Sequence, residues 1–234
     1  MSVTTSLAAR AVGEIAATRP GATAVFRHFR FDFCCMLDQT LAQVAEAHDT
    51  AVEEVVAALE AWPTPTEATR PQALEPLIGH ILARYHMVHR SELPGLIALA
   101  ETVEIHHHGH PDVPFGLAGV LRELHAALDD HMAHEELELF PRLRRIEPGS
   151  GLALQALRIE HVRLEAYLCC LETLTAGHRA PIDASADWQR LYAGTTKLVE
   201  DLLRHRYLES ETLDQCWRQG ARAMPRPQPT LSLQ

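Results

Sequence analysis

Two short stretches share one pattern, His131-Met132-Ala133-His134-Glu135 and His205-Arg206-Tyr207-Leu208-Glu209. Each places a glutamate four residues after a histidine. Four residues advance an α-helix by about 6 Å and rotate it by about 40°, so the imidazole and the carboxylate project from one face. Each stretch can therefore present two ligands to a metal ion, provided that it is helical.

The two motifs belong to an internal repeat. They begin 74 residues apart, and a further histidine precedes each of them, His86 by 45 residues and His161 by 44. Either interval is long enough for a helix of about 20 residues to rise, turn and descend by the same length. The repeat therefore predicts that all of these side chains meet at one height inside a helical bundle.

The rest of the sequence predicts an all-α fold. Ala, Leu, Glu and Arg dominate, and no segment alternates Val, Ile or Thr as a strand would. Long helical patterns cover residues 72–106, 115–146, 152–176 and 186–218. Four long helices joined by three connections predict an up-and-down four-helix bundle.

The chain divides at Trp62-Pro63-Thr64-Pro65-Thr66, where two prolines cannot continue a helix. We expect residues 1–66 to form a small helical N-terminal domain and residues 72–218 to form the bundle. Residues 221–234 contain three prolines, so we expect a disordered tail there.

Composition excludes several classes of function. The 234 residues carry a formal net charge of -10, whereas nucleic-acid binding needs a concentrated basic face. No apolar run reaches the roughly 18 residues of a membrane span, and the first residues lack the basic flank and apolar stretch of a signal peptide. We expect a cytoplasmic protein without nucleic-acid or membrane partners.

The candidate metal ligands are His86, His131, Glu135, His161, His205 and Glu209. Four imidazoles and two carboxylates are too many for one tetrahedral zinc, but they give two metals two histidines each with both carboxylates as bridges. A solvent-derived oxo or hydroxo bridge would complete two five-coordinate irons and leave a position open for a small ligand. The HExxH motif of zinc hydrolases and any CxxC pair are absent, and ferritin-type sites are richer in carboxylate.

These motifs together resemble those of the hemerythrin-like di-iron proteins, and more closely those of their repair-of-iron-centres branch. The motifs that carry the resemblance are Phe31-Asp32-Phe33-Cys34-Cys35, Gln39-Thr40-Leu41, Arg84-Tyr85-His86, Val103-Glu104 with His107, His131 through Leu139-Phe140-Pro141, Glu160-His161, and His205 to Glu209. The resemblance covers nearly the whole chain and implies that the six candidate ligands hold two irons, with both glutamates bridging.

The chain departs from that family at two places. Met36-Leu37 stand where the family usually continues from Cys-Cys into Gly-Gly, which leaves open what close approach the glycines allow. After Glu209 the second repeat lacks the Leu-Phe-Pro of the first. Because all six ligands precede that change, we expect the metal site to be retained.

His107 is a candidate for a fifth histidine ligand, because the family often has a histidine there. It lies 21 residues after His86, which is about 31 Å along a straight helix, so only a reversal at residues 91–95 could bring it to the site. We expect the neighbouring His106, His108 and His110 to lie in a solvent-exposed connection at the end of the bundle. Elsewhere we expect ordinary partly buried or surface histidines at His80, His89, His125 and His134.

The five cysteines predict reduced thiols. Cys34-Cys35 and Cys169-Cys170 are adjacent pairs, and neighbouring Cα atoms about 3.8 Å apart are too close for an unstrained bridge within a pair. Packing is the expected role of the second pair. Cys34 and Cys35 are either a small buried pair or, as the resemblance implies, thiols that receive, relay or redox-gate iron or nitric oxide.

Three functions remain open at this level. The first is a di-iron protein of the nitrosative or oxidative stress response that helps repair damaged iron-sulfur clusters, by supplying iron or by handling nitric oxide. The second is a carrier or scavenger of nitric oxide or oxygen without repair activity. The third is an enzyme that reduces nitric oxide to nitrous oxide. The oligomeric state, the electron donor and the target protein cannot be predicted from the residues.

Overall fold

The computed structural model describes residues 6–61, 73–147 and 149–223, and these ranges form helices without a strand. The expected all-α class is confirmed. One isolated antiparallel bridge joins Ala11 to Thr40.

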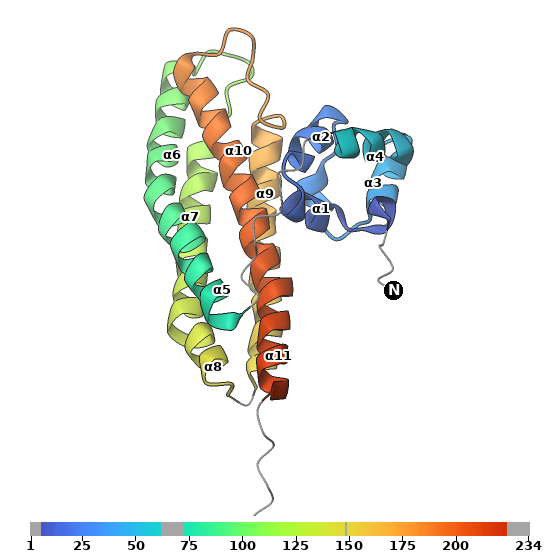
Figure 1. Cartoon of the computed structure of the whole chain (residues 1–234). Coiled ribbons are helices and arrows are strands. Elements are labelled where there is room, and N and C mark those ends of the chain that lie inside the picture. Colours follow the sequence, from blue (N-terminus) through green and yellow to red (C-terminus); the bar gives the residue numbers. More distant parts are fainter. Residues whose placement is uncertain (1–5, 62–72, 148, 224–234) are drawn as a thin grey trace, which may run out of the picture.

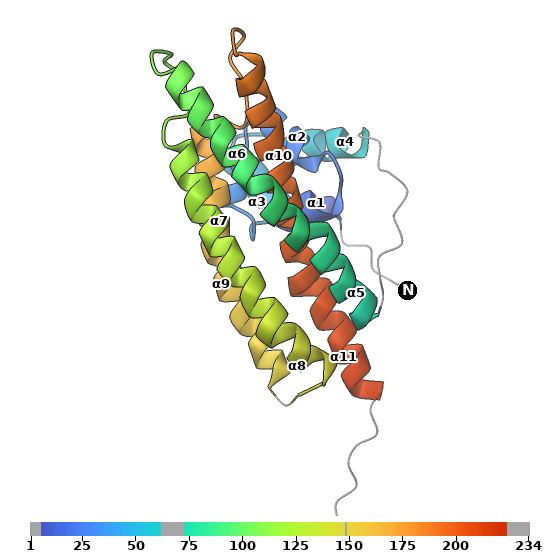
Figure 2. The ribbon, with the colours of Figure 1, turned by 90° about the vertical axis from the view of Figure 1, so that its left-hand side faces the viewer.

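Four long helical rods form the bundle (Figures 1 and 2). In three of the rods a π-helical turn interrupts the α-helix. The rods consist of α5 (Leu74–Ile81), the turn Leu82–His86 and α6 (Met87–His106); α7 (Leu117–His134), the turn Glu135–Leu139 and α8 (Phe140–Arg144); α9 (Ser150–Leu174); and α10 (Ala186–Tyr207), the turn Leu208–Leu213 and α11 (Asp214–Ala223).

Local sequence explains where several rods begin. Gly116 and Gly149 precede α7 and α9 with φ of 90° and 85°, a left-handed conformation that costs glycine little. The Ser185 hydroxyl caps α10 by accepting a hydrogen bond from the backbone N–H of Trp188. Pro94 lies inside α6, which continues through it to His106, so the chain does not reverse at residues 91–95.

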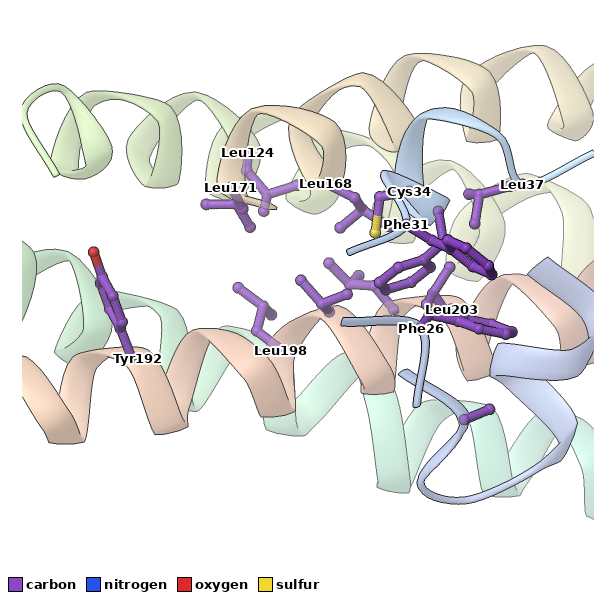
Figure 3. Close-up of a cluster of buried hydrophobic side chains, with 14 of the residues drawn as sticks. Phe26, Phe31, Cys34, Leu37, Leu124, Leu168, Leu171, Tyr192, Leu198 and Leu203 are labelled. Carbon is purple, nitrogen blue, oxygen red and sulfur yellow. The ribbon is translucent and has the colours of Figure 1, made fainter. Parts of the chain in front are cut away.

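The N-terminal domain packs against the side of the bundle formed by α9 and α10 (Figure 1). It contains α1 (Val12–Thr18), α2 (Ala22–His28), the short 3-10 helix Phe33–Cys35, α3 (Leu41–Ala47) and α4 (Val52–Ala61). Figure 3 shows Phe26, Phe31 and Leu37 of this domain beside Leu168 and Leu203 of the bundle. The two parts therefore share one hydrophobic core.

Leu37 is one of the two residues that replace the family's glycines, and it is buried. Its carbonyl oxygen accepts a hydrogen bond from the backbone N–H of Gly13 in α1. A Cβ atom at Gly13 would lie 2.9 Å from that oxygen, so α1 and the chain at Leu37 approach closely because residue 13 is glycine. At position 37 a leucine side chain thus fills part of the shared core, where the family usually has a glycine without a side chain. The close approach of the two segments depends on Gly13 instead.

Two hydrophobic clusters fill the bundle, one toward the loops that join α6 to α7 and α9 to α10, and the other around α5, α8 and α11. Between them lie buried histidine and glutamate side chains. Burying polar groups in this way lowers the stability of the fold unless the groups are paired or bind a metal. This level of the bundle is therefore the candidate functional site.

The expected domain limits are only partly described. The boundary at residues 62–66 lies outside the described residues. α11 continues to Ala223, so helix replaces the first three residues of the expected tail, and the rest of that tail also lies outside the described residues. Among the described helices, none is long and apolar enough to cross a membrane.

Candidate metal centre

The structure brings all six candidate ligands together in the buried polar layer. They come from all four rods, and none is more than 4% exposed. The cluster consists of His86, His131, Glu135, His161, His205 and Glu209. The six side chains therefore lie at one level of the bundle, as the repeat predicts.

Glu209 lies at the centre of the cluster with one carboxylate oxygen toward each pair of histidines. Its Oε1 contacts Nε2 of His205 and lies 4.0 Å from Nε2 of His86. Its Oε2 lies 2.9 Å from Nε2 of His161 and 3.7 Å from Nε2 of His131. A carboxylate with this placement can bind a separate cation through each oxygen.

Glu135 lies between the same two pairs. Its Oε2 is 3.3 Å from Nε2 of His86 and 3.6 Å from Nε2 of His131. The residue is fully buried, yet neither of its oxygens has a well-directed hydrogen bond to any described residue. A buried carboxylate without hydrogen bonds is costly, and a bound cation would remove that cost.

π-helical turns coincide with the ligands. His86 ends the turn Leu82–His86, Glu135 begins the turn Glu135–Leu139, and Glu209 is the second residue of the turn Leu208–Leu213. A π-turn widens the helix locally, and such turns are frequent at functional sites. Three of the four rods are thus irregular at the level of the cluster, which the helical pattern of the sequence does not reveal.

A second layer of polar groups orients the imidazoles. His86 Nδ1 lies 2.7 Å from Glu136, and His131 Nδ1 lies 2.9 Å from Glu160. His161 Nδ1 lies 3.1 Å from the hydroxyl of Ser210. If each Nδ1–H donates to these oxygens, each Nε2 keeps its lone pair toward the cluster, as in metal sites where a carboxylate supports a histidine ligand.

The fourth imidazole is held by rings instead. Tyr85 stacks on His205 with ring centroids 5.0 Å apart and planes 3° apart. His89 packs against the same imidazole at 5.5 Å, is 1% exposed, and has no hydrogen-bond partner at Nε2 among the described residues. His89 is thus not the ordinary histidine we expected. Because His89 lies one helical turn after the candidate ligand His86, the sequence spacing could have predicted that it faces the same side of the helix.

Burial and the two carboxylates together shift the pKa values of the cluster. Burial lowers the pKa of His86 and of His131, but hydrogen bonds and the charges of Glu135 and Glu209 outweigh it, and the values rise to about 9 and about 10. Burial and the Glu209 charge raise the pKa of Glu135 to about 7. Burial also raises the pKa of Glu209, but the imidazoles around it hold that pKa well below the usual range.

These groups fit two metal ions better than one. The geometry separates into a set of His86, Glu135, His205 and Glu209 and a set of His131, His161 and Glu209. Each set has two imidazole nitrogens, and Glu135 also lies near His131. Imidazole and carboxylate together suit iron, among other first-row metals. The cluster therefore meets the requirement of a cation site.

His107 lies far from the cluster. It caps the end of α6, where its Nε2 is 2.9 Å from the Ser185 hydroxyl and its ring packs against Trp188 at 5.1 Å. The structure thus does not bring the proposed fifth histidine to the site, because α6 runs straight through Pro94. Nearby, His110 contacts Asp183 across the same end of the bundle.

The cysteines differ from the expectation of reduced thiols. Cys35 forms a disulfide with Cys169 of α9, with the two Cα atoms 5.3 Å apart. Neighbouring Cα atoms are too close for a bridge within each pair, but a bridge between one pair and the other is not subject to that restriction. Cys34 keeps its thiol, is 3% exposed, and has a pKa raised well above the usual value by burial and by the nearby Glu172 carboxylate. Cys34 and Cys35 are therefore not two equivalent reactive thiols.

The chain matches two family models that together cover most of its length. Residues 8–62 match ScdA_N, described as a domain of unknown function (DUF542). Residues 77–213 match the Hemerythrin HHE cation binding domain, and this range contains all six candidate ligands. The cation-binding description agrees with the geometry of the buried cluster.

Several curated proteins are similar over almost their whole length. The iron-sulfur cluster repair protein YtfE of Dickeya chrysanthemi is 36% identical over 208 residues, which are 87% of this chain and 94% of the relative. The protein of the same name from Cronobacter sakazakii is 40% identical over 86% of this chain and 93% of its own. The one from Salmonella schwarzengrund is 35% identical over the same shares. With an ScdA_N domain ahead of a hemerythrin cation-binding bundle, the chain belongs to the YtfE family of iron-sulfur cluster repair proteins.

Proposed function

We propose that the chain is a non-haem di-iron protein whose ligands are His86, His131, Glu135, His161, His205 and Glu209. The observation that carries the proposal is the placement of Glu209, with one oxygen toward His205 and the other toward His161. Glu135 supports it, since its buried carboxylate lies between the same pairs, 3.3 Å from His86 and 3.6 Å from His131. Iron would supply a centre that exchanges electrons or binds a small molecule.

We further propose that this iron serves the repair of damaged iron-sulfur clusters, with apo or damaged iron-sulfur proteins as partners. The relatives bear that function in their names, and both domains of the chain match along nearly their full length. The repair would proceed by supplying iron or by handling nitric oxide during nitrosative or oxidative stress. A cytoplasmic location stays a prediction that cell fractionation can check.

A cavity beside the cluster favours a small uncharged ligand such as nitric oxide or oxygen. It touches His131, His161, His205 and Glu209, and its volume of about 20 Å³ suffices for one molecule of about the size of water. Its other walls are mainly apolar, formed by Leu128, Leu164, Leu168 and Leu202. The cavity supports the two other candidate functions as alternatives to repair: binding of nitric oxide or oxygen at the irons, and reduction of nitric oxide to nitrous oxide.

One set of assays distinguishes these roles. Repair requires that iron from the loaded chain restores the activity of an apo iron-sulfur enzyme, such as aconitase, under anaerobic conditions. Scavenging would give tight stoichiometric nitrosyl binding without that transfer, and reduction would give nitrous oxide in the presence of an electron donor. A chain that holds two irons yet fails to restore the enzyme would contradict the proposed repair role.

A further inference from the structure

Residues 34–38 of the N-terminal domain form a strap across α9 and α10. At one end of this strap, the Cys34 thiol lies 3.9 Å from the carboxylate of Glu172. At the other end, Asp38 lies 3.4 Å from the guanidinium of Arg206. Between them, the buried Leu37 packs into the core shared with the bundle (Figure 3).

One face of α9 runs from the metal cluster to the strap. His161, Glu165, Leu168 and Glu172 follow one another at intervals of three or four residues, which places them on one side of the helix. The eleven residues from His161 to Glu172 span about 16 Å. The strap contacts this face at its far end, and the metal cluster uses its near end.

Glu165 and Arg206 stand between the cavity at the metal cluster and the surface. Both line that cavity, and Arg206 Nε lies 2.5 Å from Glu165 Oε1. Arg206 also lines an open groove of about 360 Å³ between the two domains, whose other walls include Leu37 and Asp38. Arg206 is thus a wall of both the groove and the cavity, and its ion pair with Glu165 lies where the two meet.

The Cys35–Cys169 disulfide fastens the strap to α9. Cys169 directly follows Leu168, a wall of the cavity, and lies eight residues or about 12 Å beyond His161. Cys35 is exposed and Cys169 is half-buried, so a thiol in solution can reach the bond, whereas the Cys34 thiol beside it is buried. The covalent link is therefore both close to the cavity and open to reduction.

We propose that the Cys35–Cys169 disulfide is a redox site that controls access from the interdomain groove to the metal cluster. The proposal rests on the proposed metal site. In the oxidised form the strap is held on α9 and keeps Leu37, Asp38 and Arg206 in place along the groove. A dithiol reductant converts the disulfide into two thiols and is itself oxidised to a disulfide, so two electrons and two protons pass to Cys35 and Cys169. The freed strap then opens the way past Glu165 and Arg206.

Azide binding to the diferric chain tests this control without any reductant. We compare the wild type with Cys35→Ser and Cys169→Ser, which lack the bridge, and with Cys170→Ser as the control, since Cys170 is an exposed neighbour outside the disulfide. Loss of the cross-link should raise the association and dissociation rates together by about tenfold in both bridge variants. The equilibrium constant, the iron content and the optical spectrum should stay unchanged.

Hydrogen exchange gives a readout that needs no metal. In the metal-free wild type, amides of residues 33–39 should exchange faster after treatment with dithiothreitol, and those of α7 should not. Equal azide rates in all four iron-loaded proteins, or unchanged exchange at residues 33–39, would overturn the redox control. A chain that holds no iron but shows the change in exchange would instead contradict the proposed metal site alone.

Discussion

His131 Nδ1 lies 2.9 Å from Oε2 of Glu160, and Glu160 directly precedes the candidate ligand His161. The same relation recurs twice. His86 is supported by Glu136, which follows Glu135, and His161 by Ser210, which follows Glu209. Each supporting group is thus next in sequence to a candidate ligand on another rod. The packing of the rods therefore positions the ligands and their supporting groups at the same time.

Glu160→Gln should weaken metal binding while leaving the fold intact. The amide supports the His131 imidazole less well than the carboxylate, and such losses usually cost about 10–100-fold in metal affinity. Competition with a chelator of known affinity measures this change. Glu138→Gln is the matched control, because Glu138 is largely exposed and its carboxylate lies 3.8 Å from His134, away from the six candidate ligands. Equal affinities of the two variants would show that Glu160 does not support the site.

Glu135→Leu and Glu209→Leu should each lose the metal pair more completely than His161→Ala. A bridging carboxylate binds both cations and offsets charge at both, whereas an imidazole binds one. We expect well under two irons per chain and no spectrum of a coupled pair in either glutamate variant, measured by metal analysis and optical absorption. If one of these variants keeps two irons and the wild-type spectrum, that carboxylate is not a bridge.

Metal uptake should release protons at neutral pH. In the metal-free chain, His86 and His131 have pKa values of about 9 and about 10, so at pH 7.5 both imidazoles carry a proton that a metal must displace. At least two protons should therefore leave per chain loaded, with more if a water molecule becomes a hydroxo or oxo bridge, and the affinity should increase as the pH is raised from 6 to 9. Calorimetry in two buffers of different ionisation enthalpy counts the protons, and a count of zero would contradict the assigned protonation.

The metal-free chain should lose stability as the pH rises from about 7 to about 10. The folded-state pKa values of His86 and His131 lie above the usual 6.5, so their stabilisation is present below pH 6.5 and disappears as the pH passes 9 and 10. The pKa of Glu135, raised from 4.5 to about 7, acts in the same direction between those two pH values. Thermal unfolding from pH 6 to 10 checks this, and a flat profile would count against it.

The fold and the six-residue cluster could be predicted because both depend on regular spacing. Helical periodicity defines the rods, and equal offsets between two copies of one motif place His86, His131, His161 and His205 at one height. The π-turns at Glu135 and Glu209 could not be predicted, since they change the helix without changing its composition. They depend on packing between rods, which a single-chain pattern does not contain.

Other features depend on contacts between distant segments. Cys35 and Cys169 are 134 residues apart, and only the docking of the N-terminal domain on α9 brings them together. That docking also involves Arg27, which lies 2.5 Å from Glu172. His107 failed as a candidate ligand for the opposite reason, because a regular helix carries it away from the cluster, as the distance along the chain already indicated.

We expect two irons between defined pairs of histidines. Diffraction from crystals of the iron-loaded chain, measured on both sides of the iron absorption edge, tests it directly. We expect two anomalous peaks, one beside His86 and His205 and the other beside His131 and His161, with Glu135 and Glu209 contacting both. A single peak at the cluster, or iron bound only at the histidines of residues 106–110, would contradict it.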